Sequence, residues 1–98
     1  MSISDAYSNK IIRKSIRVHG SVQGVGFRYR TKYAADNYGV TGWVKNNPDG
    51  SVLMELQGTE EQIDHVFISI NQGTYIHIEQ MEVKNLPITE DEYGFYYD

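Results

Sequence analysis

The apolar residues of this 98-residue chain recur at two different spacings, and the order of those spacings restricts the fold more than any other feature. A spacing of two predicts a strand, and a spacing of three to four predicts a helix. In chain order the patterns predict a strand at 11–19, a helix at 27–38, a β-hairpin at 41–57, a helix capped at 59 and closed at 71–73, and a strand at 75–86.

Local signals mark the ends of several of these elements. Gly39 follows the first helical pattern and supplies a left-handed stop. Pro48 fixes φ at the first central position of a turn and Gly50 accepts positive φ, which makes the strands around them a hairpin. Thr59 and Gln62 have the spacing of a capping box, so the second helix begins after Thr59.

The last long strand changes phase along its length. Ile76 and Ile78 share one face of an extended chain, whereas Met81 and Val83 share the other. One extra residue near 79–80 would bring both pairs to the same face. We therefore predict a β-bulge at Glu79–Gln80.

Two amphipathic helices alternate with four strands, and few packings bury both helices on one antiparallel sheet with right-handed crossovers. The leading one is the ferredoxin-like βαββαβ sandwich, an α+β fold with both helices on one face. Pro87 ends the last long strand, and residues 93–98 are expected to add a short fifth strand. We predict one domain over 11–98 after a disordered tail at 1–10.

Composition excludes several classes of function. The net charge is −4, which is unlike the basic character of a general nucleic-acid binder. The chain has no cysteine, and hence no disulfide, thiolate metal site or cysteine nucleophile. No apolar run approaches the ~20 residues of a membrane span, and the first ten residues lack a secretory signal. We expect a cytoplasmic protein that binds neither membrane nor nucleic acid.

The stretch GSVQGVGFR at 20–28 joins a predicted strand to a predicted helix. Glycines at 20, 24 and 26 allow backbone N–H groups to converge on an anion at the positive end of the helix dipole. Arg28 follows in the first helical turn, and its planar fork matches two phosphate oxygens. From these residues alone, an anion site and a tight connection both remain open. Arg30 points to another side of the helix and is interpreted as a solvated residue.

Two segments resemble the sequence signatures of the acylphosphatases. VHGSVQGVGFR at 18–28 is similar to the first signature, and GWVKNNPDGSVLMELQG at 42–58 is similar to the second. The resemblance extends from about residue 11 to 86. It implies a monomeric ferredoxin-like enzyme that hydrolyses the carboxyl-phosphate bond of small acyl phosphates to a carboxylate and inorganic phosphate, without metal or other cofactor.

The resemblance also assigns roles to residues. It implies that Arg28 and Asn46 are catalytic, with Asn46 orienting a water molecule. Without the resemblance, ordinary turn chemistry would account for Asn46, because KNNPDG is rich in turn formers. The phosphate-binding backbone corresponds to Ser21, Val22, Gln23, Gly24, Val25 and Gly26.

Two segments outside the signatures depart from the resemblance. NQGTYIH at 71–77 stands where relatives often have a Gly-Pro-rich link, and GFYYD ends the chain where they commonly have an aromatic-aliphatic-Arg-aromatic run. Two other functions remain open: an anion-binding module without turnover, and an RNA-binding module. RNA-recognition domains carry aromatic residues on the third strand, and SVLMELQ has none. Whether His19, which borders the glycine loop, contacts substrate is also left open.

Overall fold

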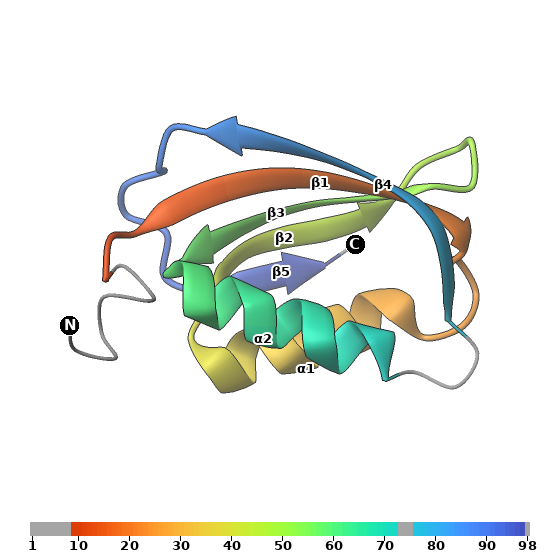
Figure 1. Ribbon diagram of the computed structural model, residues 1–98, viewed down its shortest axis with the longest axis horizontal. Coiled ribbons are helices and arrows are strands. Elements are labelled where there is room, and N and C mark those ends of the chain that lie inside the picture. Colours follow the sequence, from red (N-terminus) through yellow and green to blue (C-terminus); the bar gives the residue numbers. More distant parts are fainter. Residues whose placement is uncertain (1–8, 73–75, 98) are drawn as a thin grey trace, which may run out of the picture.

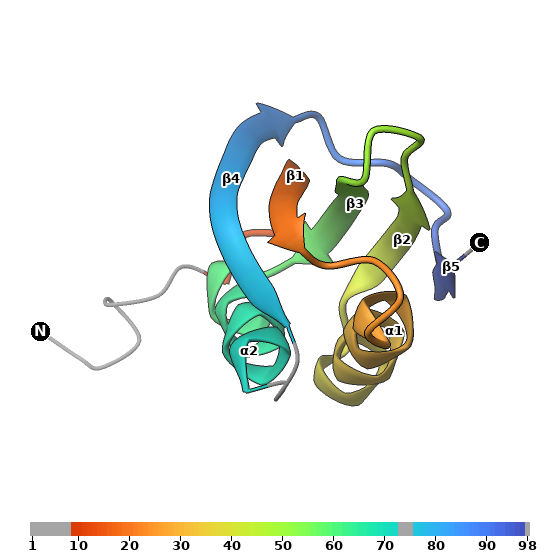
Figure 2. The same ribbon diagram turned by 90° about the vertical axis from the view of Figure 1, so that its right-hand side faces the viewer.

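A computed structural model of the protein describes residues 9–72 and 76–97. Its elements are β1 (Ile12–Ser21), α1 (Phe27–Tyr38), β2 (Thr41–Asn46), β3 (Val52–Gly58), α2 (Glu60–Asn71), β4 (His77–Leu86) and β5 (Phe95–Tyr97). The strands form one sheet in the order β4-β1-β3-β2-β5, and both helices cover one of its faces (Figures 1 and 2). The ferredoxin-like α+β prediction is confirmed. The expected tail at 1–10 falls mostly on residues 1–8, outside the described residues.

The first four strands pair in antiparallel fashion, whereas β5 runs parallel to β2. The sheet is therefore mixed rather than antiparallel throughout. The direction of β5 has a simple cause: β4 ends at the end of the sheet where β2 begins, so the chain crosses to the far edge and enters beside β2 in the same direction (Figure 1). The fifth strand expected within 93–98 is present.

The bulge predicted in β4 is also present. His19 and Gly20 of β1 pair with Gln80 and Ile78, which leaves Glu79 as the extra residue. Because one extra residue reverses the alternation of side chains, the apolar residues before and after the bulge face the same side of the sheet.

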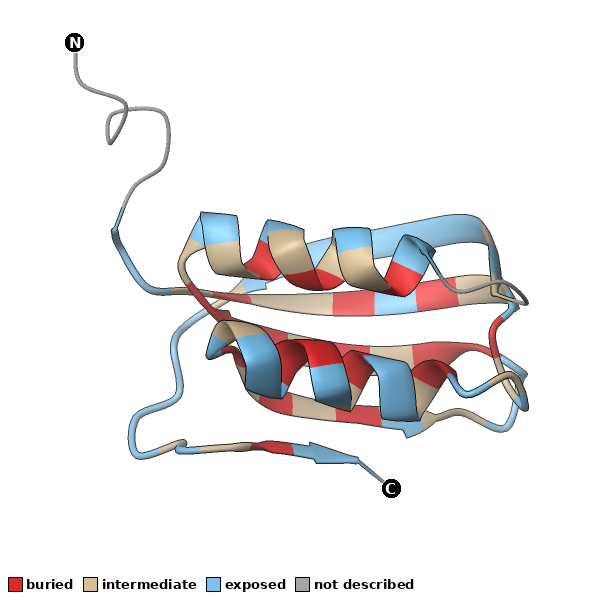
Figure 3. Ribbon diagram, turned by 90° about the horizontal axis from the view of Figure 1, so that it is seen from below, coloured by how far each residue is buried: buried red, intermediate tan, exposed pale blue. Residues whose placement is uncertain are grey.

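The core lies between the sheet and the two helices (Figure 3). Along α1 the buried residues are Phe27, Thr31, Ala34 and Ala35, and along α2 they are Ile63, Val66 and Ile70. The sheet contributes Ile16, Val18, Val44, Val52, Met54, Leu56 and Phe95. The helical and period-two patterns of the sequence placed these residues on the buried faces, with the exception of Phe95.

The residues predicted to end α1 and to begin α2 do so in the structure. Gly39 ends α1 with φ of 74°, and its N–H donates to the Ala35 carbonyl. At the start of α2, the Thr59 N–H donates to Gln62 Oε1 (2.8 Å) and the Gln62 N–H donates to Thr59 Oγ1 (3.2 Å), which completes the capping box. Gly73, expected to close α2, lies outside the described residues.

The turn between β2 and β3 is held by hydrogen bonds. The Gly50 N–H donates to the Asn47 carbonyl (3.2 Å), which places Pro48 at the first central position as predicted. The Ser51 N–H donates to Asp49 Oδ1 (2.9 Å), and the hydrogen bonds from Ser51 lower the pKa of the Asp49 carboxyl. The turn is thus a fixed support for the end of β2.

The connection from β4 to β5 is fastened to the sheet by a buried arginine. Arg13 is 4% exposed, and its Nε donates to Glu55 Oε1 (2.8 Å). Its two terminal nitrogens donate to the two carboxylate oxygens of Glu92 (2.8 and 3.2 Å). Gln57 adds two hydrogen bonds to the backbone of Thr89 (2.7 and 2.8 Å). We call Arg13, Glu55, Gln57 and Glu92 the Arg13 clamp.

Candidate active site

A small cavity of about 140 Å³ lies at the end of the sheet where the glycine loop joins β1 to α1, the end that faces the viewer in Figure 2. The end of β2 and the end of β5 reach the same place. The residues that line the cavity are Val22, Gly24, Gly26, Phe27, Arg28, Tyr29, Asn46 and Tyr97. The structure thus brings Arg28, Asn46 and part of the glycine loop together.

Two glycines give the loop its shape. Gly24 and Gly26 have φ of 74° and 79°, in the left-handed region that residues with a Cβ rarely adopt. A Cβ at either would meet no atom within 4 Å, so the requirement for glycine comes from the backbone conformation and not from crowding. The curled backbone therefore remains open to a ligand on this side.

The same loop leaves the start of α1 without a cap. Gly26 is the N-cap and makes no side-chain capping hydrogen bond, and the first turn holds no acidic residue. The first backbone bond of the helix runs from Arg30 N–H to the Gly26 carbonyl (2.9 Å). The N–H groups before Arg30 have no partner within the helix, and they carry the positive end of its dipole. This end of α1 favours an anion.

Gln23 fixes the loop against the hairpin. Its Nε2 donates to the carbonyl oxygens of Asn47 (2.7 Å) and Ser51 (2.8 Å), at the two ends of the turn between β2 and β3. The amide of Gln23 is therefore engaged in structure, and an anion in the loop would meet mainly backbone N–H groups. The two bonds also hold the loop beside Asn46, the residue before that turn.

Arg28 supplies the positive charge of the cavity. The side chain is partly buried, and it forms no ion pair with any carboxylate in residues 9–72 and 76–97. Its guanidinium carbon lies 6.0 Å from the centre of the Tyr97 ring. Arg30 is exposed and donates to the Ser69 carbonyl on α2 (3.3 Å), away from the cavity. Of the two arginines, Arg28 alone is placed to meet an anion there.

Asn46 ends β2 on the face that carries buried Val44. Its Oδ1 is buried, and within the described part of the chain no group donates a hydrogen bond to it. The turn that follows uses Asn47 instead, whose Nδ2 donates to Ser51 Oγ (3.1 Å). A buried acceptor without a partner is costly, so a group in the cavity that donates to it would be bound favourably.

Some of the sequence-predicted residues lie outside the cavity lining. Ser21 ends β1 opposite His77, and Val25 packs beside the core. His19 points to the other face of the sheet, where its Nε2 lies 2.7 Å from Glu82 Oε1. The structure therefore does not bring His19 to the glycine loop.

Sequence reasoning missed Tyr29 and Tyr97 as cavity residues. Tyr29 lies in the first turn of α1 next to Arg28, and its position was readable from the helix prediction. Tyr97 reaches the cavity only because β5 pairs with β2. No pattern within YGFYYD indicates that partner strand, since the segment is too short to show a period.

Within residues 9–72 and 76–97, no three His, Cys, Asp or Glu side chains cluster in a way that would bind a metal ion. The two described helices are each too short and too polar to cross a bilayer.

Comparisons with known proteins agree with one another. The family model described as Acylphosphatase matches residues 14–97. The acylphosphatase of Oceanobacillus iheyensis is 44% identical over 73 residues, covering 72% of this chain and 80% of that protein. The acylphosphatase of Lactobacillus johnsonii is 44% identical over 78 residues, covering 78% and 86%. The crystal structure of the Bacillus subtilis acylphosphatase matches with a TM-score of 0.81 at 31% identity, covering 89% of this chain and 98% of that chain.

Proposed function

This chain belongs to the acylphosphatase family, and we propose that it hydrolyses small acyl phosphates in the cavity where Arg28, Asn46 and the glycine loop meet. One observation carries the assignment to this cavity. One small space holds an uncapped helix start, a guanidinium that no carboxylate of the described residues pairs with, and a buried amide oxygen to which none of those residues donates. A phosphate would satisfy the guanidinium and the helix start, and a water molecule would donate to the amide oxygen.

The phosphoryl group of the substrate occupies the glycine loop. Backbone N–H groups of residues 21–26 and the start of α1 donate to its oxygens. Arg28 donates through its planar fork to two of the oxygens at once. Both interactions strengthen as charge spreads over the phosphoryl oxygens in the loose transition state. They therefore stabilise the transition state more than the bound substrate.

Asn46 positions the attacking water. Its Oδ1 accepts a hydrogen bond from the water, and its amide N–H₂ donates to a neighbouring oxygen. The water oxygen forms a bond to phosphorus, and the bond from phosphorus to the carboxyl oxygen breaks. The bonding electrons leave with the carboxylate, and the proton of the water passes to a phosphoryl oxygen. The amide takes no proton, and the activated anhydride needs no separate base.

The size of the cavity fits the phosphoryl end of the substrate rather than the whole substrate. Its volume of about 140 Å³ is below the ~300–1,000 Å³ usual for sites that enclose a whole organic ligand. The phosphoryl end of the substrate is enclosed, and the acyl end extends toward solvent. The net charge of −4 is unlike that of a general nucleic-acid binder, and we propose that the protein acts as a monomer without nucleic acid. A cytoplasmic location suits a chain that needs no disulfide to fold.

The test uses benzoyl phosphate in water enriched in ¹⁸O, with a chelator present. We expect loss of benzoyl phosphate by absorbance, with one ¹⁸O appearing in inorganic phosphate and none in benzoate. Label in benzoate would mean attack at the acyl carbon and would contradict the role of the glycine loop. Binding of phosphate without turnover would instead identify an anion-binding module, the second function that the sequence left open.

A further inference from the structure

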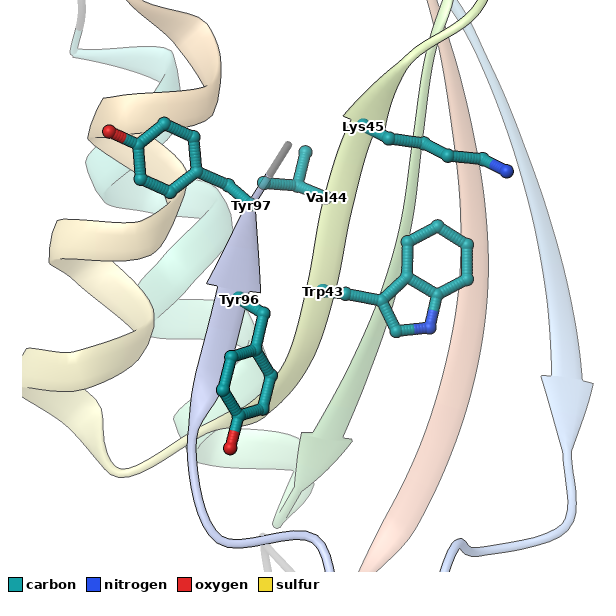
Figure 4. Close-up of a pocket in the computed structure, with 5 residues that line it drawn as sticks. All are labelled: Trp43, Val44, Lys45, Tyr96 and Tyr97. Atoms are coloured by element: carbon teal, nitrogen blue, oxygen red, sulfur yellow. The ribbon is translucent and has the colours of Figure 1, made fainter.

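Strand β5 places the aromatic ring of Tyr97 at the cavity. In the parallel register of β5 and β2, Tyr97 lies beside Val44 on the helix-facing side. Figure 4 shows the Tyr97 ring directed toward α1, whereas Trp43 and Lys45 extend on the other side of β2. Tyr96 pairs with Trp43 and belongs to that other side. Of the two adjacent tyrosines, only Tyr97 therefore reaches the cavity.

Tyr97 contacts the cavity without competing for the phosphate. Its ring centre lies 6.0 Å from the guanidinium carbon of Arg28, at the outer limit of a cation–π contact. A guanidinium binds oxygens through the N–H groups at its edge and stacks on rings through its flat face. Arg28 can thus hold a phosphoryl group and the Tyr97 ring together.

The position of the phosphoryl group determines where the acyl group goes. Val22 and Phe27 are the buried apolar residues of the cavity lining, and the glycine loop would surround a phosphate bound as proposed. The remaining side chains at the opening are Tyr29 and Tyr97, which are 65% and 46% exposed. An acyl group that leaves the cavity therefore passes aromatic side chains, and Arg28 is the one charged residue of the lining.

Tyr97 lies on a strand whose backbone is anchored, and it is the less exposed of the two tyrosines. The backbone of β5 pairs with β2, and Phe95 beside it is 2% exposed. The Phe95 carbonyl accepts a hydrogen bond from Lys32 Nζ (2.9 Å), and the Gly94 carbonyl accepts one from the Gly42 N–H (3.1 Å). The Arg13 clamp fastens the preceding connection. An anchored backbone at Tyr97 reduces the freedom that is lost when a ligand packs against its ring.

We propose that Tyr97 determines the acyl-group specificity of the enzyme, by packing its ring against planar or aromatic acyl groups and favouring them over small aliphatic ones. The inference rests on the proposed function, because it requires the phosphoryl group to occupy the glycine loop.

The experiment compares kcat/KM for benzoyl phosphate and acetyl phosphate in the wild type, Tyr97→Ala, Tyr97→Leu, Tyr97→Phe and Tyr96→Ala. Tyr97→Ala and Tyr97→Leu are expected to lower the benzoyl-to-acetyl ratio by about 2- to 10-fold, the range that one aromatic contact supplies. Most of the change should be in KM for benzoyl phosphate. Tyr97→Phe keeps the ring and should keep the ratio.

Tyr96→Ala is the matched control, since it removes a tyrosine from the same strand on the opposite face. It should leave the ratio unchanged. Inhibition by inorganic phosphate should be similar in all five proteins, which would show that the glycine loop is intact. Tyr97→Leu retains apolar bulk and gives a folded variant if Tyr97→Ala unfolds.

Three results would overturn the inference, and the third would overturn the proposed function as well. If the Tyr97 variants lowered kcat/KM equally for both substrates, the ring would serve structure or Arg28 and not specificity. If Tyr96→Ala changed the ratio as much as Tyr97→Ala, strand stability would be the cause. A wild type that hydrolysed neither substrate would refute the proposed function itself, and the inference with it.

Discussion

Arg28 and Arg30 stand two positions apart on one helix and form different contacts. Arg28 lines the cavity, and Arg30 donates to a carbonyl of α2. We expect Arg28→Ala to lower kcat/KM by about 100- to 1,000-fold, the loss typical of one donor to a developing oxyanion. Arg30→Ala is the matched control and should retain near wild-type activity. Steady-state hydrolysis of benzoyl phosphate measures both.

Arg28→Lys tests the geometry of the contact rather than its charge. Lysine keeps the positive charge but lacks the planar fork. We expect Arg28→Lys to recover only a small part of the kcat that is lost in Arg28→Ala. Full activity in Arg28→Lys would show that a point charge suffices, and the bidentate contact would have to be abandoned.

Asn46 is predicted to act on the water and not on the phosphate. Asn46→Ala should therefore lower kcat while leaving inhibition by inorganic phosphate nearly unchanged. Asn46→Asp should lower kcat further than Asn46→Ala and should also weaken inhibition by inorganic phosphate, because a carboxylate at this position repels the phosphoryl oxygens. Competitive inhibition constants separate the two effects. Loss of phosphate affinity in Asn46→Ala would contradict the water-orienting role.

At the scale of elements, Gln23 links two pieces of the site that are distant in sequence. Gln23→Ala removes two hydrogen bonds between the glycine loop and the turn after β2. We expect a loss of about 1–3 kcal/mol in the free energy of unfolding, with weaker inhibition by inorganic phosphate. Urea denaturation and an inhibition assay measure these. Unchanged phosphate inhibition would mean that the loop keeps its shape without this link.

The elements that could be predicted are those with local causes. The capping box at Thr59, the left-handed stop at Gly39 and the phase change around Glu79 each depend on neighbouring residues. The parallel pairing of β5 does not, because it follows from where β4 ends. Tyr97 was missed as a cavity residue for that reason, whereas Arg28 and Asn46 lie in segments whose resemblance to a family is local.

The burial of Arg13 likewise could not be predicted from the residues near it in the sequence. Alternation along β1 places it on the face away from the helices, where an arginine is ordinarily solvated. It is buried because the distant connection from β4 to β5 lies over it and supplies Glu92. Contacts between segments so far apart in the sequence produce no periodic pattern from which they could be predicted.

At the scale of the whole molecule, the Arg13 clamp predicts an acid-dependent loss of stability. Burial acts to raise the pKa of Glu92, but hydrogen bonds from Arg13 and Thr41 and the charge of Arg13 outweigh it and hold the pKa below its usual value. A carboxyl with a lowered folded pKa stabilises the fold above its unfolded pKa of about 4.3. That stabilisation is lost as the pH falls through the folded pKa.

Glu92→Gln tests this dependence. At pH 7 the variant should be less stable by about 1–3 kcal/mol, the range for hydrogen bonds to charged groups. Below about pH 4 the difference from the wild type should shrink, because protonated Glu92 resembles glutamine. Thermal unfolding from pH 3 to 7 measures the difference. Asp36→Asn is the control: it removes the same charge from an exposed pair with Lys32 and should change stability little. A constant difference across the pH range would refute the pairing.

The path of the last strand has a practical consequence for anyone who produces this enzyme. A purification tag or fluorescent protein joined after residue 98 would start one residue beyond Tyr97, a residue of the cavity lining. Joined before residue 1, the same cargo would lead into β1 at Ile12, and the length of that ten-residue strand, about 33 Å, separates its entry from the glycine loop. If Tyr97 contacts the acyl group as proposed, we expect a carboxyl-terminal label to shift the preference between acyl groups and an amino-terminal label to leave it unchanged.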